Sequence, residues 1–472
     1  MKGMTLERME QACHARLCGA PADQKTIGQA EAAGIVIDSR QVKEGFVFVA
    51  LPGERVDGHD FIPQVFAKGA FAVVCEREPE QAEGVCLLVD SSKEALKQLA
   101  ALYLDELDIP VVGITGSVGK TSTKEMIASV LSQKYLVHKT AGNFNNEIGL
   151  PLTVFGLRQE HEVAVLEMGI SDFGEMSRLA AVARPRVSVI TNIGICHLEN
   201  LGTRDGILKA KTEVFDYLRD NATVVLNGDD DKLCTVAKVQ GKAPVFYGMG
   251  ETRPDGAAYD KKAIFADAVE NRGFRGIDFD LHMPQSTHRV HVAIPGAHNV
   301  YNAMAAAAVG LALGLSEAEI CAGIEAARTI GGRTNLIEAG GYLVIDDCYN
   351  ANPVSMKAAL DVLAQGEGRT IAVLGDMGEL GADEKQLHYE VGVYVAKKQI
   401  DWLFAAGELS RELVRGVCEY PDFTTQYDYF GTDVETLCAR VCEFAQPGDT
   451  ILVKASHFMD YPRIVKALTE EK

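Results

Sequence analysis

The stretch that most constrains the fold is GITGSVGKTSTKE, at residues 113–125. It follows the apolar residues IPVV and leads into a segment in which Met126, Ile127, Val130 and Leu131 recur on one helical face. A glycine-rich turn between a strand and a helix directs backbone N–H groups at an anion, and the helix N-terminus adds its positive dipole end. The stretch therefore predicts a phosphate-binding loop in an α/β fold.

The residue types of this loop predict how a nucleotide would be held. Gly116 and Gly119 permit a tight turn, Lys120 can reach the terminal phosphates, and the Thr121 hydroxyl can bind Mg²⁺. One position departs from the common G-x-x-x-x-G-K-[ST] pattern, because Ile114 stands where the first glycine is expected. The loop predicts nucleotide binding but not the reaction, since motors, switches, kinases and ligases all hold ATP in this way.

Length and charge limit the classes of function. A chain of 472 residues is too long for one ordinary core, so two or three domains are expected. The formal net charge of −20 argues against a nucleic-acid-binding surface, which needs a basic footprint. Small anionic substrates stay compatible with this charge, because a local group of cationic side chains and helix N-termini suffices to bind them.

Cysteine usage and hydropathy indicate a cytoplasmic protein. The eleven cysteines are scattered without a C-x-x-C pair, which favours reduced thiols. Glu7, Arg8 and Glu10 interrupt the place where a secretion signal would be apolar. The longest weakly polar run, at 302–315, is too short to span a bilayer and predicts a buried helix, so no membrane insertion is expected.

Three zones differ in pattern and predict three α/β domains. Residues 1–108 are expected to form an N-terminal substrate domain with short strands and one long helix. Residues 109–331 are expected to form a central P-loop domain with a parallel sheet, and residues 332–472 a Rossmann-like C-terminal domain. The stretch 231–293 mixes strand-like and loop-like signals and gives the weakest prediction.

Continuous apolar runs support this division, because central parallel strands are buried on both faces. In the central zone they alternate with helix-length segments, and in the C-terminal zone the alternation repeats. The runs are VAVLEMG (163–169), VSVITNIG (187–194) and TVVLNGD (223–229), then YLVIDDCY, TIAVLGDMG, DWLFAAGE and TILVKAS.

Two candidate metal-side residues follow strand patterns. Glu167 closes one apolar run and His197 lies just after the next. Ligands of open α/β sheets gather at the carboxyl ends of strands, so both side chains could face the nucleotide phosphates beside a divalent ion. The alternative is that Glu167 is a solvated strand end and His197 an ordinary loop histidine, and the local pattern alone favours this alternative.

Other single residues are ambiguous by themselves. On pattern alone Lys211 is a solvated helix lysine. Asn299 and Asn302 share one face at the start of an alanine-rich helix, where they could either cap it or present amides to an adenine edge. Arg333 lies in a turn and could be a phosphate clamp or a surface charge.

Taken together, the motifs resemble one family. The phosphate loop is combined with I-D-S-R (37–40), L-P-G-E-R-V-D-G-H-D-F-I (51–62), N-F-N-N-E-I-G-L-P (143–151), L-E-M-G (166–169), N-I-G-I-C-H (192–197), K-A-K-T-E-V-F (209–215), G-A-H-N-V-Y-N-A (296–303), G-G-R (331–333), D-D-C-Y-N-A-N-P (346–353) and V-L-G-D-M-G-E-L-G (373–381). This order resembles the Mur ligases, the ATP-dependent amide-forming enzymes of peptidoglycan precursor synthesis, over nearly the whole chain.

The resemblance implies an activity, its substrates and its cofactors. It implies an ATP-dependent acid–D-amino-acid ligase that joins D-alanyl-D-alanine to UDP-N-acetylmuramoyl-tripeptide through an acyl phosphate, in a monomeric cytoplasmic protein. Two Mg²⁺ ions are implied, held by Thr121, Glu167, His197 and a carbamylated Lys211. Lys120, Glu167, His197 and Lys211 are the implied catalytic residues.

The resemblance also implies which residues contact the substrates. Asn299 and Asn302 would contact adenine, Arg333 phosphate and Asp347 ribose. The remaining implied ATP contacts are Gly116, Ser117, Val118, Gly119, Lys120, Thr121 and Ser122. The implied substrate-binding residues are Ser39 and Arg40, for the uridine nucleotide, and Asn145 and Asn146, near the substrate carboxylate.

One stretch departs from the family pattern. The C-terminal strand of the family runs into V-K-G-S-R-G, whereas this chain has V-K-A-S-H-F at 453–458, and Pro462 replaces a usual acidic residue. Because His457 lacks the fixed charge and fork of arginine, the departure bears on amine specificity. The alternatives are another Mur or folylpolyglutamate-type amide ligase and a nucleotide switch without turnover.

Overall fold

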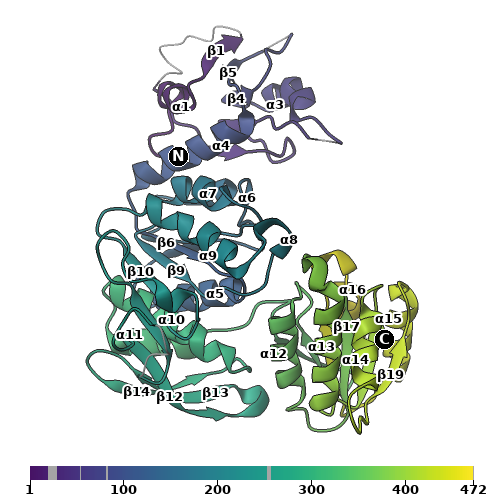
Figure 1. Ribbon diagram of the computed structural model, residues 1–472. Helices are drawn as coiled ribbons and strands as arrows, with labels where there is room; N and C mark the ends of the chain where they lie inside the picture. The colour runs from purple at the N-terminus through teal and green to yellow at the C-terminus, as the bar shows by residue number, and fades with distance from the viewer. Residues whose placement is uncertain (20–28, 54, 81–82, 252–256, 471–472) are drawn as a thin grey trace.

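The computed structural model describes residues 1–19, 29–53, 55–80, 83–251 and 257–470. Three β-sheets follow one another along the chain, each flanked by helices (Figure 1). The predicted three-domain α/β fold is therefore confirmed. The exact boundaries between the domains stay predictions.

The N-terminal sheet has five strands in the order β1-β5-β4-β3-β2. Strands β2 to β5 are parallel, and β1 pairs antiparallel with β5. The sequence pattern does not predict β1, because it is a four-residue edge strand without a fully buried residue. The strands are β1 (Arg16–Gly19), β2 (Gly34–Val36), β3 (Phe46–Val49), β4 (Ala72–Cys75) and β5 (Val85–Leu88), and the helices are α1 (Leu6–Cys13), α3 (Ile62–Ala67) and α4 (Ser92–Leu107).

Helix α4 joins the first two domains. Ser91 precedes the helix, and its side chain accepts a hydrogen bond from the backbone N–H of Glu94 and so caps the helix. Its apolar side chains belong to one continuous core that includes residues of both domains. The Tyr103 hydroxyl also donates to the carbonyl of Leu157 in the central domain, at 2.9 Å. The first two domains are thus packed together through α4 (Figure 1).

The central sheet has nine strands in the order β14-β13-β12-β11-β10-β9-β6-β8-β7. It is parallel from β7 to β12 and ends in the antiparallel hairpin β13–β14, which lies in the stretch with mixed sequence signals. The strands are β6 (Val111–Thr115), β7 (Val137–Lys139), β8 (Val163–Glu167), β9 (Val187–Ile190), β10 (Thr223–Asn227), β11 (Val245–Met249), β12 (Ile264–Asn271), β13 (Ile277–His282) and β14 (Thr287–Val292).

Helices cover both faces of the parallel part of this sheet, which explains why β6, β8 and β9 are buried throughout. One face packs against α5 (Lys120–Leu131), α10 (His298–Ala312) and α11 (Glu317–Ala326). The other packs against α6 (Gly149–Phe155), α7 (Glu175–Ala183) and α9 (Arg204–Thr212), next to α4. The helix predicted at 302–315 is α10, and it is buried.

The C-terminal sheet has six strands in the order β15-β16-β20-β17-β18-β19, of which only β15 is antiparallel to its neighbour. The strands are β15 (Asn335–Ala339), β16 (Tyr342–Asp346), β17 (Thr370–Gly375), β18 (Trp402–Ala406), β19 (Gln426–Tyr429) and β20 (Thr450–Lys454). The helices are α12 (Pro353–Leu363), α13 (Glu384–Lys397), α14 (Ser410–Cys418), α15 (Val434–Phe444) and α16 (Pro462–Thr469).

Two further properties of the sequence can be compared with the structure. All eleven cysteines lie in the described part of the chain, and none of them is in a disulfide bond there. Within the described part of the chain, no helix combines the length and apolarity needed to cross a membrane.

Candidate active site

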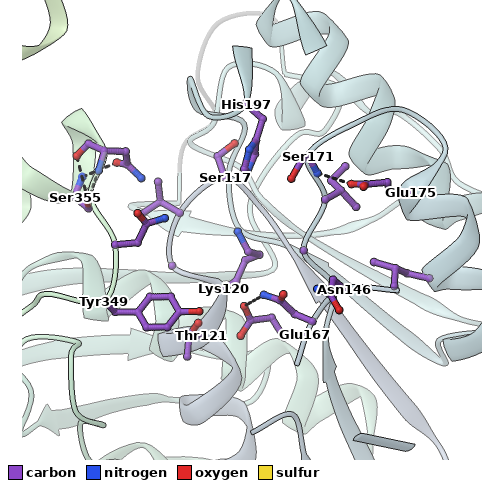
Figure 2. Close-up of a pocket in the computed structure, with 18 of the residues that line it drawn as sticks. Ser117, Lys120, Thr121, Asn146, Glu167, Ser171, Glu175, His197, Tyr349 and Ser355 are labelled. Atoms are coloured by element: carbon purple, nitrogen blue, oxygen red, sulfur yellow. Dashed lines mark hydrogen bonds between the residues drawn. The ribbon is translucent and has the colours of Figure 1, made fainter. Parts of the chain in front are cut away.

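A pocket of about 390 Å³ opens between the central and C-terminal domains (Figure 2). The central domain contributes the phosphate loop, the end of β8 and His197 in the segment after β9, and the C-terminal domain contributes Arg333 and the segment after β16. Among the lining residues are Ser117, Val118, Gly119, Lys120, Thr121, Asn145, Asn146, Glu167, His197, Arg333 and Tyr349. The structure thus brings together predicted residues that are far apart in sequence.

The phosphate loop starts at Gly116 and not at the position of Ile114, which is buried inside β6. Gly116 has φ +149°, and a Cβ there would lie 1.9 Å from the Thr191 hydroxyl oxygen, so only glycine fits. The side chain of Asn192 fastens the loop: its Oδ1 accepts from the Val118 N–H at 2.9 Å, and its Nδ2 donates to the Val118 carbonyl at 3.0 Å.

The reactive end of the loop faces the pocket. Lys120 Nζ donates to the Gly116 carbonyl at 2.9 Å, so its ammonium lies over the turn, where an incoming phosphate would compete for it. Ser117 Oγ accepts from the Gly194 N–H at 2.8 Å, which ties the loop to the segment after β9. Helix α5 begins directly after Gly119, so its N-terminal N–H groups point at the same place.

Glu167 is buried at the end of β8, so the alternative of a solvated strand end is wrong. Its Oε1 accepts from Asn145 Nδ2 at 2.8 Å, whereas its buried Oε2 has no hydrogen-bond partner among the described residues. The ammonium of Lys124 lies 3.9 Å from that oxygen and donates to the Thr140 carbonyl at 2.6 Å. One carboxylate oxygen is therefore left to accept a further ligand.

The other predicted carboxylate-side residue, Asn146, has a local role. Its Oδ1 accepts from the backbone N–H groups of Ile148 and Gly149, at 3.2 and 2.8 Å, just ahead of α6. Asn145 and Asn146 both line the pocket, but the amide of Asn145 is the one that contacts Glu167.

His197 lines the pocket from the start of the short helix α8 (Leu198–Leu201). Its φ of +54° is uncommon for a residue with a side chain. Its Nδ1 lies 2.7 Å from Oε2 of Glu379, which belongs to the C-terminal domain. The histidine therefore takes part in a contact between two domains.

Lys211 lies on α9 and is buried with 1% of its surface exposed, so its interpretation as a solvated lysine is wrong. Burial, reinforced by the positive charge of Lys120, lowers its pKa to about 7. A large share of the amine is therefore uncharged near neutral pH.

Arg333 is a bridge between domains and not a surface charge. Its guanidinium stacks on the Tyr349 ring at 4.1 Å, and its Nη2 lies 3.3 Å from Thr121 Oγ1. Its buried Nε has no hydrogen-bond partner among the described residues. The Nε–H group can therefore donate a further hydrogen bond at the place where the central and C-terminal domains meet.

An adjoining pocket of about 190 Å³ lies on the other side of the loop. Asn302 lines it, and Asn299 lies one turn before on α10. Neither asparagine caps the helix: Asn302 Nδ2 donates to Asn299 Oδ1 at 2.9 Å, and Asn299 Nδ2 donates to the Pro295 carbonyl at 2.9 Å. Ser122 also lines this pocket.

Asp347 closes the adjoining pocket from the C-terminal domain. Its Oδ2 lies 2.6 Å from the buried ammonium of Lys454, and its Oδ1 accepts from the Thr334 N–H at 2.9 Å. Both oxygens are therefore already engaged, and a contact with ribose would be an additional one.

Ser39 and Arg40 do not line either pocket. They follow β2 in the N-terminal domain, where Arg40 forms a bidentate pair with Asp38 and lowers the pKa of that carboxyl to about 2. The Ser39 carbonyl accepts from Lys68 Nζ at 2.7 Å.

The stretch at 455–458, which departs from the family pattern, contributes to the packing of the C-terminal domain. Ala455 and Ser456 are buried, and Ser456 Oγ accepts from the Gly378 N–H at 2.8 Å. The ring of His457 lies 6.0 Å from that of Tyr349, and Phe458 is 68% exposed.

The sequence did not predict a place in the site for Lys124, Asn192, Tyr349 or Glu379. All four lie within or next to motifs that carry the resemblance, but their contacts join residues distant in sequence. No cluster of three or more His, Cys, Asp or Glu side chains with metal-binding geometry occurs in the described ranges.

Three comparisons identify the family. The "Mur ligase family, catalytic domain", "Mur ligase middle domain" and "Mur ligase, glutamate ligase domain" models match residues 31–104, 114–310 and 332–457. The chain is 40% identical over 444 residues to the UDP-N-acetylmuramoyl-tripeptide--D-alanyl-D-alanine ligase of Bacillus subtilis, covering 93% of each chain.

Solved structures agree with the family models. A crystal structure of MurF from Acinetobacter baumannii superimposes with a TM-score of 0.87 at 33% identity, covering 99% of each chain. MurF ligase from Thermotoga maritima in complex with ADP gives a TM-score of 0.79 at 30% identity, covering 92% of this chain and 96% of that one. The chain belongs to the Mur ligase family.

Proposed function

We propose that this protein is the ligase that joins D-alanyl-D-alanine to UDP-N-acetylmuramoyl-tripeptide, with ATP converted to ADP and phosphate. The observation that carries the proposal is the likeness over 93% of the chain to a relative with that name, at 40% identity. The pocket between the domains supports it, because phosphate-binding and carboxylate-side residues converge there.

An amide does not form from a carboxylate and an amine at neutral pH unless the carboxylate is activated. In the proposed reaction a carboxylate oxygen of the tripeptide attacks the γ-phosphorus of ATP, and the bond to the β-phosphate oxygen breaks. Lys120 and the N-terminus of α5 neutralise charge on the transferring group, and Arg333 reaches the phosphates from the C-terminal domain.

The second step releases phosphate. The dipeptide amine attacks the acyl carbon of the acyl phosphate, the amine loses a proton, and phosphate leaves. Because an acyl phosphate hydrolyses in water, the C-terminal domain must cover the pocket before the amine reacts. Tyr349 and Arg333 support this closure, since they reach the phosphate loop from the segment that begins the C-terminal domain.

The donor set fits Mg²⁺. The buried Oε2 of Glu167, which accepts no hydrogen bond from the described residues, and the Thr121 hydroxyl line the place where phosphates would lie, and oxygen ligands are those that Mg²⁺ prefers. The imidazole of His197 would add a nitrogen ligand. Bound Mg²⁺ supplies charge neutralisation to the phosphates. Substrate phosphates and water would complete the coordination of such an ion.

Lys211 would add a ligand as a carbamate, formed when its uncharged amine takes up CO₂. Burial supports this, because a permanently charged ammonium is unfavourable where 1% of the residue is exposed. The product would carry a negative charge on the α9 side of the site.

The N-terminal domain would hold the uridine nucleotide through the segment of Ser39 and Arg40. We expect the protein to act as a monomer, as the resemblance to the Mur ligases implies. We place the reaction in the cytoplasm, where ATP is available and the eleven cysteines would stay reduced.

The test is ADP release by the purified protein with Mg²⁺, ATP and UDP-N-acetylmuramoyl-tripeptide, with and without D-alanyl-D-alanine. Release that depends on the dipeptide, with the amide product identified by mass spectrometry, is the expected result. Release that depends instead on L-lysine, diaminopimelate or glutamate would assign another amide ligase. Tight ATP binding without release under any amine would reveal a nucleotide switch.

A further inference from the structure

The loop after β17, residues 376–381, carries the motif D-M-G-E-L-G, which has no role in the proposed reaction. The C-terminal domain holds this loop firmly at three points. The Asp376 carbonyl accepts from the Ser456 N–H at 3.0 Å, and the Gly378 N–H donates to Ser456 Oγ at 2.8 Å. The Met377 N–H donates to the buried His388 Nε2 at 2.9 Å.

Glu379 projects from this loop to the central domain. Its Oε2 lies 2.7 Å from His197 Nδ1, and both residues have positive φ angles, +60° for Glu379 and +54° for His197. Residues other than glycine rarely adopt this region, and it persists where the surroundings enforce it. The contact therefore joins two residues, one from each domain, whose backbone conformations are both unfavourable.

The ion pair belongs to a wider contact between domains. Gly381 has φ +66°, and a Cβ there would lie 3.7 Å from the Glu199 backbone nitrogen and 3.9 Å from Leu198 Cβ. The short helix η5 (Gly381–Asp383) thus rests on α8, directly beside His197. The carboxylate reaches the imidazole only when the two domains are in this arrangement.

The chemical consequence concerns the two imidazole nitrogens. A carboxylate that accepts from Nδ1–H fixes the tautomer and the ring orientation, and Nε2 is left as the nitrogen with a free lone pair. Since His197 lines the pocket, that lone pair is the one available to the phosphate site.

We propose that Glu379 is a positioning residue: when the C-terminal domain closes, it holds the imidazole of His197 with Nε2 directed to the phosphate site. The inference rests on the proposed function, because it assumes that His197 serves the divalent ion there. Domain closure then completes the site through a side chain of the C-terminal domain that does not itself line the pocket.

The rival explanation is an ordinary surface ion pair. The Glu379 side chain is 63% exposed, and exposed pairs contribute little to stability. Both explanations therefore predict a normal melting temperature for Glu379→Gln. They differ in what happens to the imidazole and to the divalent ion.

The experiment compares the full-length wild type with Glu379→Gln and with Asp383→Asn, an exposed carboxylate four residues further along the same surface. Mn²⁺ binding in the presence of ADP is measured by electron paramagnetic resonance. The His197 ring nitrogens are followed by ¹⁵N-histidine NMR and assigned with His197→Asn. Steady-state kinetics with ATP and the dipeptide give kcat and KM separately.

We expect Glu379→Gln to weaken Mn²⁺ binding and lower kcat by about 10- to 100-fold, with KM for ATP changed by less than about twofold. The His197 Nδ1 resonance should shift in this variant, and Asp383→Asn should match the wild type. Unchanged Mn²⁺ affinity and ring resonances in Glu379→Gln, or equal losses in both variants, overturn the inference. Metal binding and the ring spectrum need no dipeptide, so a failure of the proposed ligation is distinguished from a failure of this inference.

Discussion

The guanidinium Nη2 of Arg333 lies 3.3 Å from the hydroxyl oxygen of Thr121, in the first turn of α5. This contact joins the start of the C-terminal domain to the phosphate loop, and the Tyr349 ring holds the guanidinium plane from the other side. Arginine can stack on a ring and present several donors at once, which lysine cannot do. Arg333 is therefore placed to connect the proposed nucleotide site with the position of the C-terminal domain.

Arg333→Lys should weaken ADP binding by about 1.5–3 kcal/mol, because the substitution keeps the charge but loses the planar fork and the stacking. Isothermal titration calorimetry with Mg²⁺ and ADP checks this. Arg415→Lys, at a half-exposed arginine on α14, is the control and should bind as the wild type does. An Arg333→Lys protein with wild-type affinity would show that the contact with Thr121 has no part in nucleotide binding.

Lys120→Met should lower kcat by about 10²- to 10³-fold, a loss of about 2.7–4 kcal/mol of transition-state stabilisation. The ammonium lies over the phosphate turn, and no other described lysine lines the pocket. Dipeptide-dependent ADP release measures the effect, with Lys385→Met, an exposed lysine on α13, as the control. Melting temperatures should stay unchanged, since the hydrogen bond of Lys120 Nζ stays within its own loop.

The sequence predicted the strands whose burial can be read from their own residues. The strands β8, β9, β17 and β20 are continuous apolar runs, and a run of that kind is buried on both faces whatever its neighbours are. The sequence did not predict the edge strand β19 (Gln426–Tyr429), because its residues are mostly exposed and polar. Its pairing with β18 therefore produces no recognisable sequence pattern.

The predicted site residues differ from the missed ones in whether the local sequence determines their position. The phosphate loop is a local motif, and the spacing of its residues alone predicts phosphate binding. Lys211 is buried only because the helices of the central domain pack around it, and helix pattern gives no sign of that. Asn192 supports Val118 from 74 positions away, a contact that only the strand order β9-β6 creates.

Lys211 should carry a carbamate in the working enzyme. Protein equilibrated with ¹³C-bicarbonate near pH 8 should give a carbamate resonance in the ¹³C spectrum, because the uncharged amine reacts with CO₂ and burial favours that form. Lys211→Arg should lack the resonance and lose activity. Lys209→Arg, two residues earlier on the same helix, should keep both. A resonance that survives in Lys211→Arg would assign the carbamate to another amine.

Glu147 should contribute a pH-dependent part of the stability of the joint between the first two domains. It lies just ahead of α6 and contacts Lys93 Nζ at 2.9 Å and Lys97 Nζ at 3.4 Å, both on α4, as well as Arg178 on α7. Burial alone would raise its pKa, but the hydrogen bonds from Lys93 and Arg178 together with the charges of Lys97 and Lys93 outweigh burial and hold the pKa at about 2.

A carboxyl whose pKa is depressed by folding stabilises the folded state above its unfolded pKa, and the contribution is lost as pH falls toward the folded value. The Glu147→Gln variant should therefore be less stable than the wild type by about 2 kcal/mol at pH 7. The difference should be constant from pH 7 down to about 5.5 and shrink below about 4.5, where the unfolded carboxyl takes up its proton.

Thermal unfolding of both proteins across this pH range measures the difference, and Glu162→Gln is the control. Glu162 is an exposed glutamate whose carboxylate accepts a hydrogen bond from the backbone N–H of Leu136, within the central domain. Its substitution should give a small difference that does not follow the Glu147 profile. A Glu147→Gln difference that stays the same at pH 7 and pH 4 would mean that the lysines and the arginine do not hold the carboxylate in its charged form, and that the joint depends on the apolar packing of α4 alone.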